Sequence, residues 1–445
     1  MYIYEVEGEH SDSNAGVSED QIPINFSKRE TGDPKTLRLL SLFSGCGGMD
    51  IGFEGGFIAP RKSFSENSDS IEQVLDDDWI LLKKNRFCTI FANDILPEAE
   101  VGWTTYMSRH HHKSDIYKRI SLVDLVKMHN QGADVFPDDV DVVTGGFPCQ
   151  DFSVAGKRKG FESHKDHEGK VRTDDLSSEE SRGKLYFWMK QVIDITRPKV
   201  FVAENVKGLV SLGDVKDTIQ HDFASADGNG YVVLDPQVLH AANYGVPETR
   251  ERVIFIGIRI DALCPEALSA LQQKDVPKMY NPYPTPTHNY TVNDNSLLPI
   301  VTTKDVLGKL PEPLEAKDLA QTQYSKAKFL THGQGQTEIK LDGLGPTIRS
   351  EHHGNIEFRR LSEEHGGKYL NELSQGKIER RLTPRECALI QTFPPDYEFV
   401  VKGTGHAYKL SASGAYKIIG NAVPPVLAYH IARRLEEVWP LYFGE

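Results

Sequence analysis

The chain has 445 residues, of which 39% are hydrophobic, so it can bury a large core and is predicted to form one large and one smaller domain. Its formal net charge of −13 excludes a surface that attracts nucleic acid everywhere, although basic side chains can still gather in one place. No apolar run approaches the roughly 20 residues that cross a bilayer, and the first residues carry no signal pattern. We therefore expect a soluble intracellular protein.

Residues 1–35 are polar and acidic without a sustained period, which predicts a loose N-terminal arm. Short apolar runs then recur, with segments of helical pattern between them, at 37–43, 88–94, 140–146, 199–205 and 252–258. Continuous β-branched runs at this spacing are typical of buried parallel strands. They predict a doubly wound α/β sheet within residues 36–260.

The character of the sequence changes after this predicted sheet. Pro, Asn, Thr and Gly dominate residues 261–379, which predicts a second, smaller and loop-rich domain. Helical pattern returns at 385–393 and 426–439. We therefore expect residues 380–445 to rejoin the large domain.

A glycine-rich loop follows the first predicted strand, in FSGCGGMDIGF (43–53). Gly45 and Gly48 allow a sharp turn and let backbone N–H groups approach a ligand at a helix N-terminus, although a plain structural turn has the same composition. Asp94 ends the second strand, where a carboxylate can accept both hydroxyls of a ribose or cap a helix. Together the two features indicate an adenosine-containing cofactor.

Five cysteines are scattered along the chain without a C-x-x-C pair, so neither a disulfide framework nor a zinc site is expected. The run RHHHK (109–113) does not change this, because adjacent histidines cannot all face one ion. Cys149, in GGFPCQDFS (145–153), follows a strand end. A helix N-terminus or a cation there would lower the pKa of its thiol and make it a nucleophile, whereas the alternative is a buried small hydrophobe.

Two further strand ends carry charged side chains. Glu204 ends the fourth run, where burial beside a cofactor would raise the pKa of its carboxyl and let it donate a proton; a helix cap is the alternative. Arg250 and Arg252 stand two apart at the start of the fifth run, so both side chains point to the same face. They suit a phosphate or a base oxygen, unless the strand is a solvated edge.

The segments FSGCGG, GGFPCQDFS, AENVKGL, the Arg-x-Arg pair and GNAVPP (420–425) occur in one order between Leu39 and about Leu435. In that order they resemble the motifs of the cytosine-C5 DNA methyltransferase family. The resemblance implies the mixed α/β sheet of the S-adenosylmethionine-dependent methyltransferases, with a target-recognition domain at 261–379. It also implies transfer of a methyl group from S-adenosyl-L-methionine to carbon 5 of a cytosine flipped out of a specific double-stranded DNA sequence.

Catalytic roles carry over by position in this resemblance. Cys149 resembles the nucleophile that attacks carbon 6, Glu204 the acid that protonates ring N3, and Arg252 the arginine that reaches O2 of the base. Arg250 resembles the residue that supports the loop around it. The residues that resemble cofactor contacts are Phe43, Gly45, Gly48, Asp94, Ile95, Asp115, Ile116, Asn421 and Ala422.

DNA contacts are implied in two segments. GKRKG (156–160) resembles part of the loop that closes over DNA, with a plain surface loop as the alternative, and its candidates for phosphate contact are Lys157, Arg158 and Lys159. The candidates for base-edge or phosphate contact in the smaller domain are Thr347, Ile348, Arg349, His352, His353, Asn355, Arg359 and Arg360. We expect a basic groove between the two domains.

Three departures from the family pattern are visible. Glu248 stands where the family usually has Gln, residues 58–87 form an insert, and the segment after Ser153, up to ESRGKLYF (180–187), is long and charged. The rival functions are an RNA (tRNA) cytosine-C5 methyltransferase and a catalytically silent DNA-binding relative. The size of 261–379 favours DNA over tRNA, and the intact Cys149 and Glu204 favour an active enzyme.

The setting implied by the resemblance is a prokaryotic restriction–modification system. Methylation there protects host DNA from a companion restriction endonuclease, which is a genetic rather than a physical partner. We expect a monomer in the cytoplasm that meets the nucleoid through DNA and has neither a membrane partner nor a metal.

Overall fold

The computed structural model describes residues 36–110, 112–148, 185–350, 356–405 and 407–444. The predicted N-terminal arm therefore lies outside the described residues. The candidate site residues that also lie outside them are Cys149, Lys157, Arg158, Lys159, His352, His353 and Asn355. No helix in the described part of the chain is long and apolar enough to cross a membrane.

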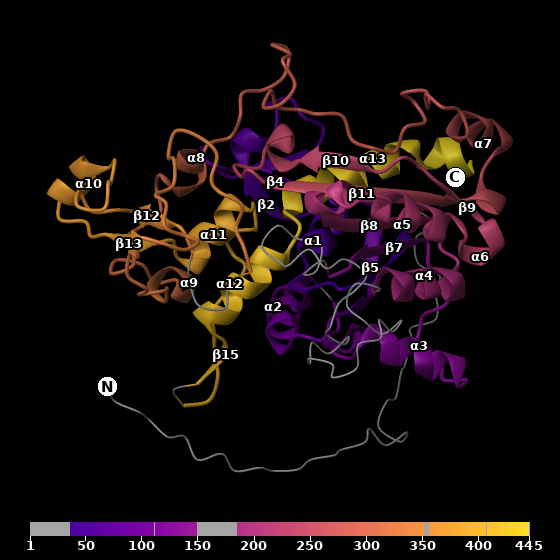
Figure 1. Cartoon of the computed structure of the whole chain (residues 1–445), viewed down its shortest axis with the longest axis horizontal. Coiled ribbons are helices and arrows are strands. Elements are labelled where there is room, and N and C mark those ends of the chain that lie inside the picture. Colours follow the sequence, from indigo (N-terminus) through magenta and orange to yellow (C-terminus); the bar gives the residue numbers. More distant parts are fainter. Residues whose placement is uncertain (1–35, 111, 149–184, 351–355, 406, 445) are drawn as a thin grey trace.

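One mixed sheet forms the centre of the molecule (Figure 1). Its strands are β1 (Leu37–Leu42), β5 (Phe87–Asn93), β6 (Tyr117–Lys118), β7 (Val142–Gly146), β8 (Val200–Val206), β9 (Tyr231–Val233), β10 (Gln237–His240) and β11 (Glu251–Arg259). Their spatial order is β10-β11-β8-β7-β1-β5-β6, with β9 also paired to β11. The predicted α/β class with a mixed sheet is confirmed.

The direction of the fifth predicted strand was wrong. β6, β5, β1, β7 and β8 run parallel to one another, but β11 is antiparallel to β8, and β9 and β10 are antiparallel to β11. A parallel neighbour would need a crossover back to the starting edge of the sheet. Here the chain after β8 forms β9 and β10 first, and β11 then runs in the direction opposite to β8.

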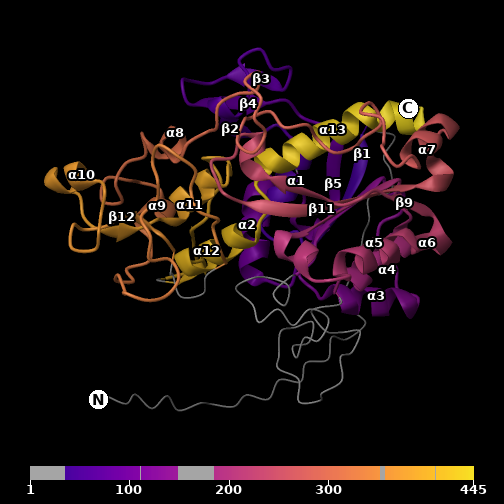
Figure 2. The same ribbon diagram turned by 45° about the horizontal axis from the view of Figure 1, so that its top comes forward.

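Helices cover both faces of the sheet (Figures 1 and 2). The helices on one side are α1 (Gly48–Glu54), α2 (Pro97–Met107) and α13 (Pro425–Phe443), and those on the other are α3 (Leu122–Asn130), α4 (Leu185–Thr196), α5 (Val215–Ala224) and α6 (Ala226–Asn229). Neighbouring residues of β1 serve the two sides in turn: Leu39 packs in the core with α1 and α13, and Leu40 in the core with α3 and α4.

The last helix lies against the first. A Cβ added at Gly52 of α1 would lie 2.5 Å from both the Ala428 Cβ and the Pro425 carbonyl oxygen of α13, so only glycine allows this approach. The insert at 58–87 packs beside the same helix, where Tyr429 meets the rings of Phe57 and Phe64 edge to face. It forms a small antiparallel sheet of β2 (Ile58–Pro60), β4 (Trp79–Leu82) and β3 (Ile71–Val74).

The region after β11 consists mostly of loops with short elements (Figure 1). These elements are α7 (Pro265–Leu271), α8 (Thr303–Leu307), α9 (Leu319–Thr322), β12 (Phe358–Arg360), α10 (Leu370–Ser374), β13 (Arg380–Arg381), α11 (Pro384–Ile390), β14 (Val401–Lys402), β15 (Tyr408–Leu410) and α12 (Ala412–Asn421). Both views place α8 to α10 and β12 at the end of the molecule opposite α7, and β13 pairs with β12 there.

Candidate active site

The loop between β1 and α1 turns sharply at three residues with left-handed backbone. The φ angles are 51° at Phe43, 54° at Gly45 and 84° at Gly47, and such values are uncommon for a residue with a side chain such as Phe. A Cβ added at Gly48 would lie 2.2 Å from the Val423 carbonyl oxygen, whereas one at Gly45 would meet no atom closer than 4.0 Å. The loop is therefore packed tightly at Gly48 and has room beside Gly45.

The carboxylate of Asp94 joins the ends of β1 and β5. Its Oδ2 accepts a hydrogen bond of 3.0 Å from the Gly45 N–H, and its Oδ1 accepts one of 2.9 Å from the Leu96 N–H. Burial raises the pKa of Asp94 above its ordinary value, against the effect of these hydrogen bonds. A carboxylate has about four acceptor positions, so Asp94 can still accept a hydroxyl donor.

A buried acid, Asp50, holds the loop between β1 and α1 in place. Asp50 of α1 accepts hydrogen bonds of 2.6 Å from the Ser41 hydroxyl and 2.6 Å from the Trp103 indole N–H. Burial raises the pKa of Asp50 to about 6. The Trp103 ring in turn fills the space beside Gly47, where a Cβ would lie 2.9 Å from it. Asp50 and Trp103 were not predicted from the sequence; the signal was an acid among the apolar and glycine residues of the first turn of α1.

The other predicted cofactor contacts lie around the loop. Ala422 is buried, with its Cβ 3.3 Å from the position of a Cβ at Gly48, and Asn421 beside it is exposed. Ile95 directly follows Asp94 and is half-buried. Asp115 and Ile116 lie in the turn before β6, which pairs with β5.

Glu204 and Arg252 form a buried ion pair at the end of β8. The Arg252 Nε lies 2.6 Å from Glu204 Oε1, and both side chains are about nine-tenths buried. A Cβ added at Gly146, the last residue of β7, would lie 2.9 Å from Glu204 Oε2. Burial raises the pKa of Glu204 above its ordinary value even though Arg252 and Arg250 favour the ionised form. A glutamic acid with these surroundings is suited to donate a proton.

Arg250 occupies a different place from Arg252. It is fully buried, and its guanidinium group donates to the carbonyl oxygens of Ile348 (3.0 Å), Gly420 (2.9 Å) and Ala422 (2.7 Å). Arg250 therefore joins three segments that are far apart in the sequence.

The described part of this region ends at Pro148, just beyond β7. The Asn205 side-chain amide donates a hydrogen bond of 3.1 Å to the Phe147 carbonyl oxygen. This bond ties the chain in front of residue 149 to the end of β8, where Glu204 lies.

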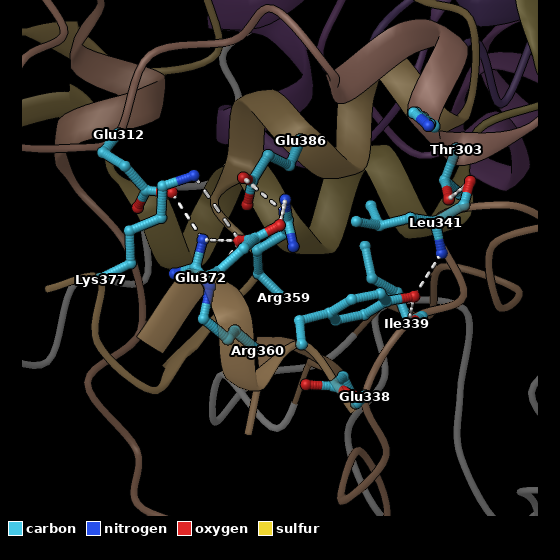
Figure 3. A network of polar contacts seen from close by, with 12 residues as sticks. Thr303, Glu312, Glu338, Ile339, Leu341, Arg359, Arg360, Glu372, Lys377 and Glu386 are labelled. Carbon is cyan, nitrogen blue, oxygen red and sulfur yellow. Dashed lines mark hydrogen bonds and ion pairs between the residues drawn. The ribbon is translucent and has the colours of Figure 1, made fainter. Parts of the chain in front are cut away.

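Arg359 and Arg360 point inward rather than to solvent. Arg360 is fully buried, and its guanidinium group lies 2.7 Å from Glu312 and 2.7 Å from Glu372 (Figure 3). Arg359 is 7% exposed and donates to Glu372 at 3.3 Å. A base or phosphate would have to displace these carboxylates, and separating a buried pair costs several kcal/mol. Their placement explains the two arginines as structural residues.

The segment around Thr347 and Ile348 lies against the start of β11. The Thr347 hydroxyl donates to the Thr249 carbonyl oxygen at 2.6 Å, and Ile348 is fully buried. Arg349 is half-buried and its guanidinium group lies 2.9 Å from Glu357. Of these three predicted DNA contacts, Ile348 is therefore enclosed by protein.

A loop that we did not single out carries the exposed polar side chains of this region. Residues 323–337, which follow α9, contain Lys326, Lys328 and His332 and no Asp or Glu, in a chain with a net charge of −13. Leu330 to Gln334 are all exposed. The missing acids were visible in the sequence and could have identified the loop.

One buried guanidinium group closes this loop. Arg381 is 1% exposed and donates to the carbonyl oxygens of Ala327 and Lys328 at one end, both at 3.0 Å, and of Gly335 at the other. Because both ends are tied to one rigid group, the exposed tip is held in a defined position.

Comparison with known proteins covers the same segments. Residues 37–437 match the family model described as C-5 cytosine-specific DNA methylase. Type II methyltransferase M.BsuRI of Bacillus subtilis is 31% identical over 92% of this chain and 81% of its own length, and M.BspRI of Lysinibacillus sphaericus is 30% identical over 96% and 85%. A solved structure of an Escherichia coli prophage putative DNA modification methyltransferase is 18% identical, with a TM-score of 0.48 over 91% of this chain and 99% of its own.

Proposed function

The chain belongs to the C-5 cytosine-specific DNA methylase family, and we propose that Glu204, Arg252 and Cys149 are the residues with which it methylates carbon 5 of a cytosine in DNA. The Glu204–Arg252 pair carries this assignment. A carboxyl group with a raised pKa and a guanidinium group lie within 2.6 Å of each other, at the sheet edge where β7 and β8 both end. An acid and a cation together match the N3 and O2 atoms on one edge of a cytosine.

Carbon 5 of cytosine is a poor nucleophile and must be activated before it accepts a methyl group. In our proposal the Cys149 thiolate forms a bond to carbon 6 while Glu204 gives its proton to N3, so that the electron pair of the C5–C6 double bond becomes available at carbon 5. Arg252 holds O2 and stabilises the Glu204 carboxylate that remains. After methylation a base removes the carbon 5 proton, the C5–C6 double bond re-forms, the thiolate leaves carbon 6, and N3 returns its proton to the Glu204 carboxylate.

The residues around the glycine loop fit S-adenosyl-L-methionine, which the family uses. The open side of Gly45 suits the methionine part, and the free lone pairs of Asp94 suit the ribose hydroxyls. We propose Phe43, Ile95 and Ile116 beside the adenine, with Asp115 at its edge. When bound, this cofactor supplies the methyl group for carbon 5 and is left as a neutral thioether.

We further propose that the loop of residues 326–334 contacts the DNA, with Arg349 and Thr347 beside it. Lys326 and Lys328 suit phosphates, and the exposed amide of Gln334 suits an adenine edge. Electrostatic attraction at one face lets a protein with a net charge of −13 bind a polyanion. Lys157, Arg158 and Lys159 remain proposed phosphate contacts.

Replacing both Lys326 and Lys328 with alanine tests this loop. If each lysine neutralises one phosphate, the slope of log K against log salt for DNA binding becomes less steep by about 2. The measurement is a titration of labelled duplex at several salt concentrations. The matched control replaces Lys274 and Lys278, two exposed lysines in the segment that follows α7, a helix at the opposite end of the molecule (Figures 1 and 2). An equal change in both variants would place the DNA elsewhere.

Both relatives described above are named Type II methyltransferases, which supports a restriction–modification setting. We therefore propose that methylation by this chain protects host DNA in a bacterial cytoplasm from a companion endonuclease.

Labelled cofactor separates this function from its rivals. Incubated with S-adenosylmethionine carrying a labelled methyl group, the protein is expected to label duplex DNA and to leave tRNA unlabelled. Bisulfite sequencing of a plasmid from an expressing host then gives the target sequence. Label on tRNA alone would favour the RNA methyltransferase, and no label on either would favour the silent relative.

A further inference from the structure

The side chain of Glu248 lies between the start of the strand that carries Arg252 and the segment that begins at residue 345. It is fully buried, and its Oε1 accepts a hydrogen bond of 2.7 Å from the Ile348 N–H. The same oxygen lies 3.6 Å from the Arg250 guanidinium group, which is also fully buried. Glu248 therefore places a carboxyl group beside a guanidinium group that otherwise donates to carbonyl oxygens.

Backbone hydrogen bonds link residues 247–249 to Gly345, and we call this contact the joint. Glu248 and Gly345 form a parallel bridge, in which the Thr249 N–H donates to the Gly345 carbonyl oxygen at 3.0 Å and the Gly345 N–H donates to the Pro247 carbonyl oxygen at 2.9 Å. The joint leads from the loop-rich region directly into β11, which carries Arg252 two residues after Arg250.

The end of α12 closes the joint from the other side. A Cβ added at Gly420 would lie 2.2 Å from the Arg349 carbonyl carbon, so the segment after Ile348 runs directly against this helix end. Arg250 reaches across both segments to Ala422, which borders the glycine loop. A change in the position of Arg250 would therefore shift both Ala422, which borders the glycine loop, and the start of β11, which carries Arg252.

We propose that Glu248 is a positioning residue that couples the docking of segment 345–350 to the placement of Arg252 and Glu204. By holding the Arg250 guanidinium group and the Ile348 N–H together, it fixes the start of β11 relative to the loop-rich region. A base held by the DNA contacts of that region then lies at one fixed position relative to the Glu204–Arg252 pair. This inference rests on the proposed function of that pair.

The first test compares Glu248→Gln and Glu248→Ala with the unchanged chain. Misplacement of a catalytic group lowers the rate without abolishing binding, so we expect the single-turnover methyl-transfer rate on duplex DNA to fall about 10-fold for glutamine and about 100-fold for alanine. The KM for DNA and the cofactor affinity should change by less than about threefold. The glutamine variant keeps the shape of the side chain and decides the question if the alanine variant does not fold.

A double-mutant cycle shows whether Glu248 acts through Arg250. If it does, adding Glu248→Ala to Arg250→Met should lower the rate by no more than about twofold further. If the two substitutions lower the methyl-transfer rate by factors that multiply, Glu248 does not act through Arg250 and the proposal is wrong. The control for a purely structural effect is Glu386→Gln, which removes a buried carboxylate that pairs with Arg380 at 2.8 Å. We expect this control to lower the melting temperature and leave the methyl-transfer rate unchanged below it.

The two levels of proposal fail in different ways. If the unchanged chain does not label duplex DNA, the proposed function is wrong. If it labels DNA and both Glu248 variants match its rate, only the positioning role is wrong.

Discussion

Replacing Glu204 with glutamine is expected to lower the rate of methyl transfer by about 10²- to 10⁴-fold, the usual contribution of a general acid or base. Glutamine has nearly the same shape, and its amide oxygen can still accept from Arg252, which lies 2.6 Å from Glu204. It cannot give a proton to N3. The measurement is the single-turnover rate with labelled cofactor at saturating DNA, and cofactor affinity should stay within about threefold of the unchanged chain.

The pH dependence of this rate follows from the direction of the Glu204 pKa shift. Burial raises that pKa, so the proton-donating form persists to higher pH than in an ordinary glutamic acid. We expect the rate of the unchanged chain to fall as the pH rises through this raised pKa, and the glutamine variant to lose that decline. The linked contribution to stability is present below the pKa of the unfolded state, about 4.3, and is lost as the pH rises through the raised value.

Glu251 provides a matched control for Glu204. It lies at the start of β11 next to Arg252, is only half-buried and pairs with Lys207 at 2.8 Å. Surface pairs of this kind contribute about 0 to 1 kcal/mol, so Glu251→Gln should leave both the rate and its pH profile unchanged. A Glu204→Gln variant as active as this control would remove Glu204 from the chemistry.

Five strands of the sheet, β1, β5, β7, β8 and β11, could be predicted because each is a short apolar run, and such runs require burial on both sides. The runs at 37–43 and 199–205 correspond to β1 and β8 within a residue. The direction of β11 could not be predicted in the same way. A buried run reads alike in parallel and antiparallel pairs, and the choice depends on β9 and β10, which are short and weakly patterned.

The candidate site was predictable where it depends on strand ends. Asp94 follows the carboxyl end of β5 and Glu204 lies near that of β8, and the carboxyl ends of parallel strands meet at one edge of the sheet, so a single sequence suffices to bring them into one region. The loop-rich region has no such rule. Whether Arg360 faces DNA or a carboxylate depends on Glu312 and Glu372, which reach it only in the folded chain.

The nucleophile can be tested even though Cys149 lies outside the described residues. Three of the four described cysteines make poor rivals. Cys46 and Cys387 are fully buried, and burial raises the pKa of both thiols, while it raises that of Cys88 to about 11. A thiol with a raised pKa is largely un-ionised at neutral pH and does not attack carbon 6. This leaves Cys149, which follows β7 in the sequence, and Cys264, which precedes α7, and the resemblance of GGFPCQDFS to the family motif favours Cys149 as the thiolate.

Cys149→Ser is therefore expected to lower the methyl-transfer rate by at least about 10³-fold, because a serine hydroxyl without a partner base is far less nucleophilic than a thiolate. Duplex DNA with 5-fluorocytosine at the target makes the test direct. Fluorine at carbon 5 cannot leave as a proton, so the final elimination stops and the protein stays bonded to carbon 6. The unchanged chain should give this covalent adduct on a denaturing gel, and the serine variant should give none.

Cys88→Ser is the matched control for this experiment, since it removes one sulfur from a half-buried site on β5. It should form the adduct as the unchanged chain does. An adduct that persists in Cys149→Ser would show that another group attacks the base. If Glu204→Gln forms the adduct at a much reduced rate and Cys149→Ser forms none, the two roles are separated. The thiolate then makes the bond to carbon 6, and the carboxyl group speeds bond formation by giving its proton to N3.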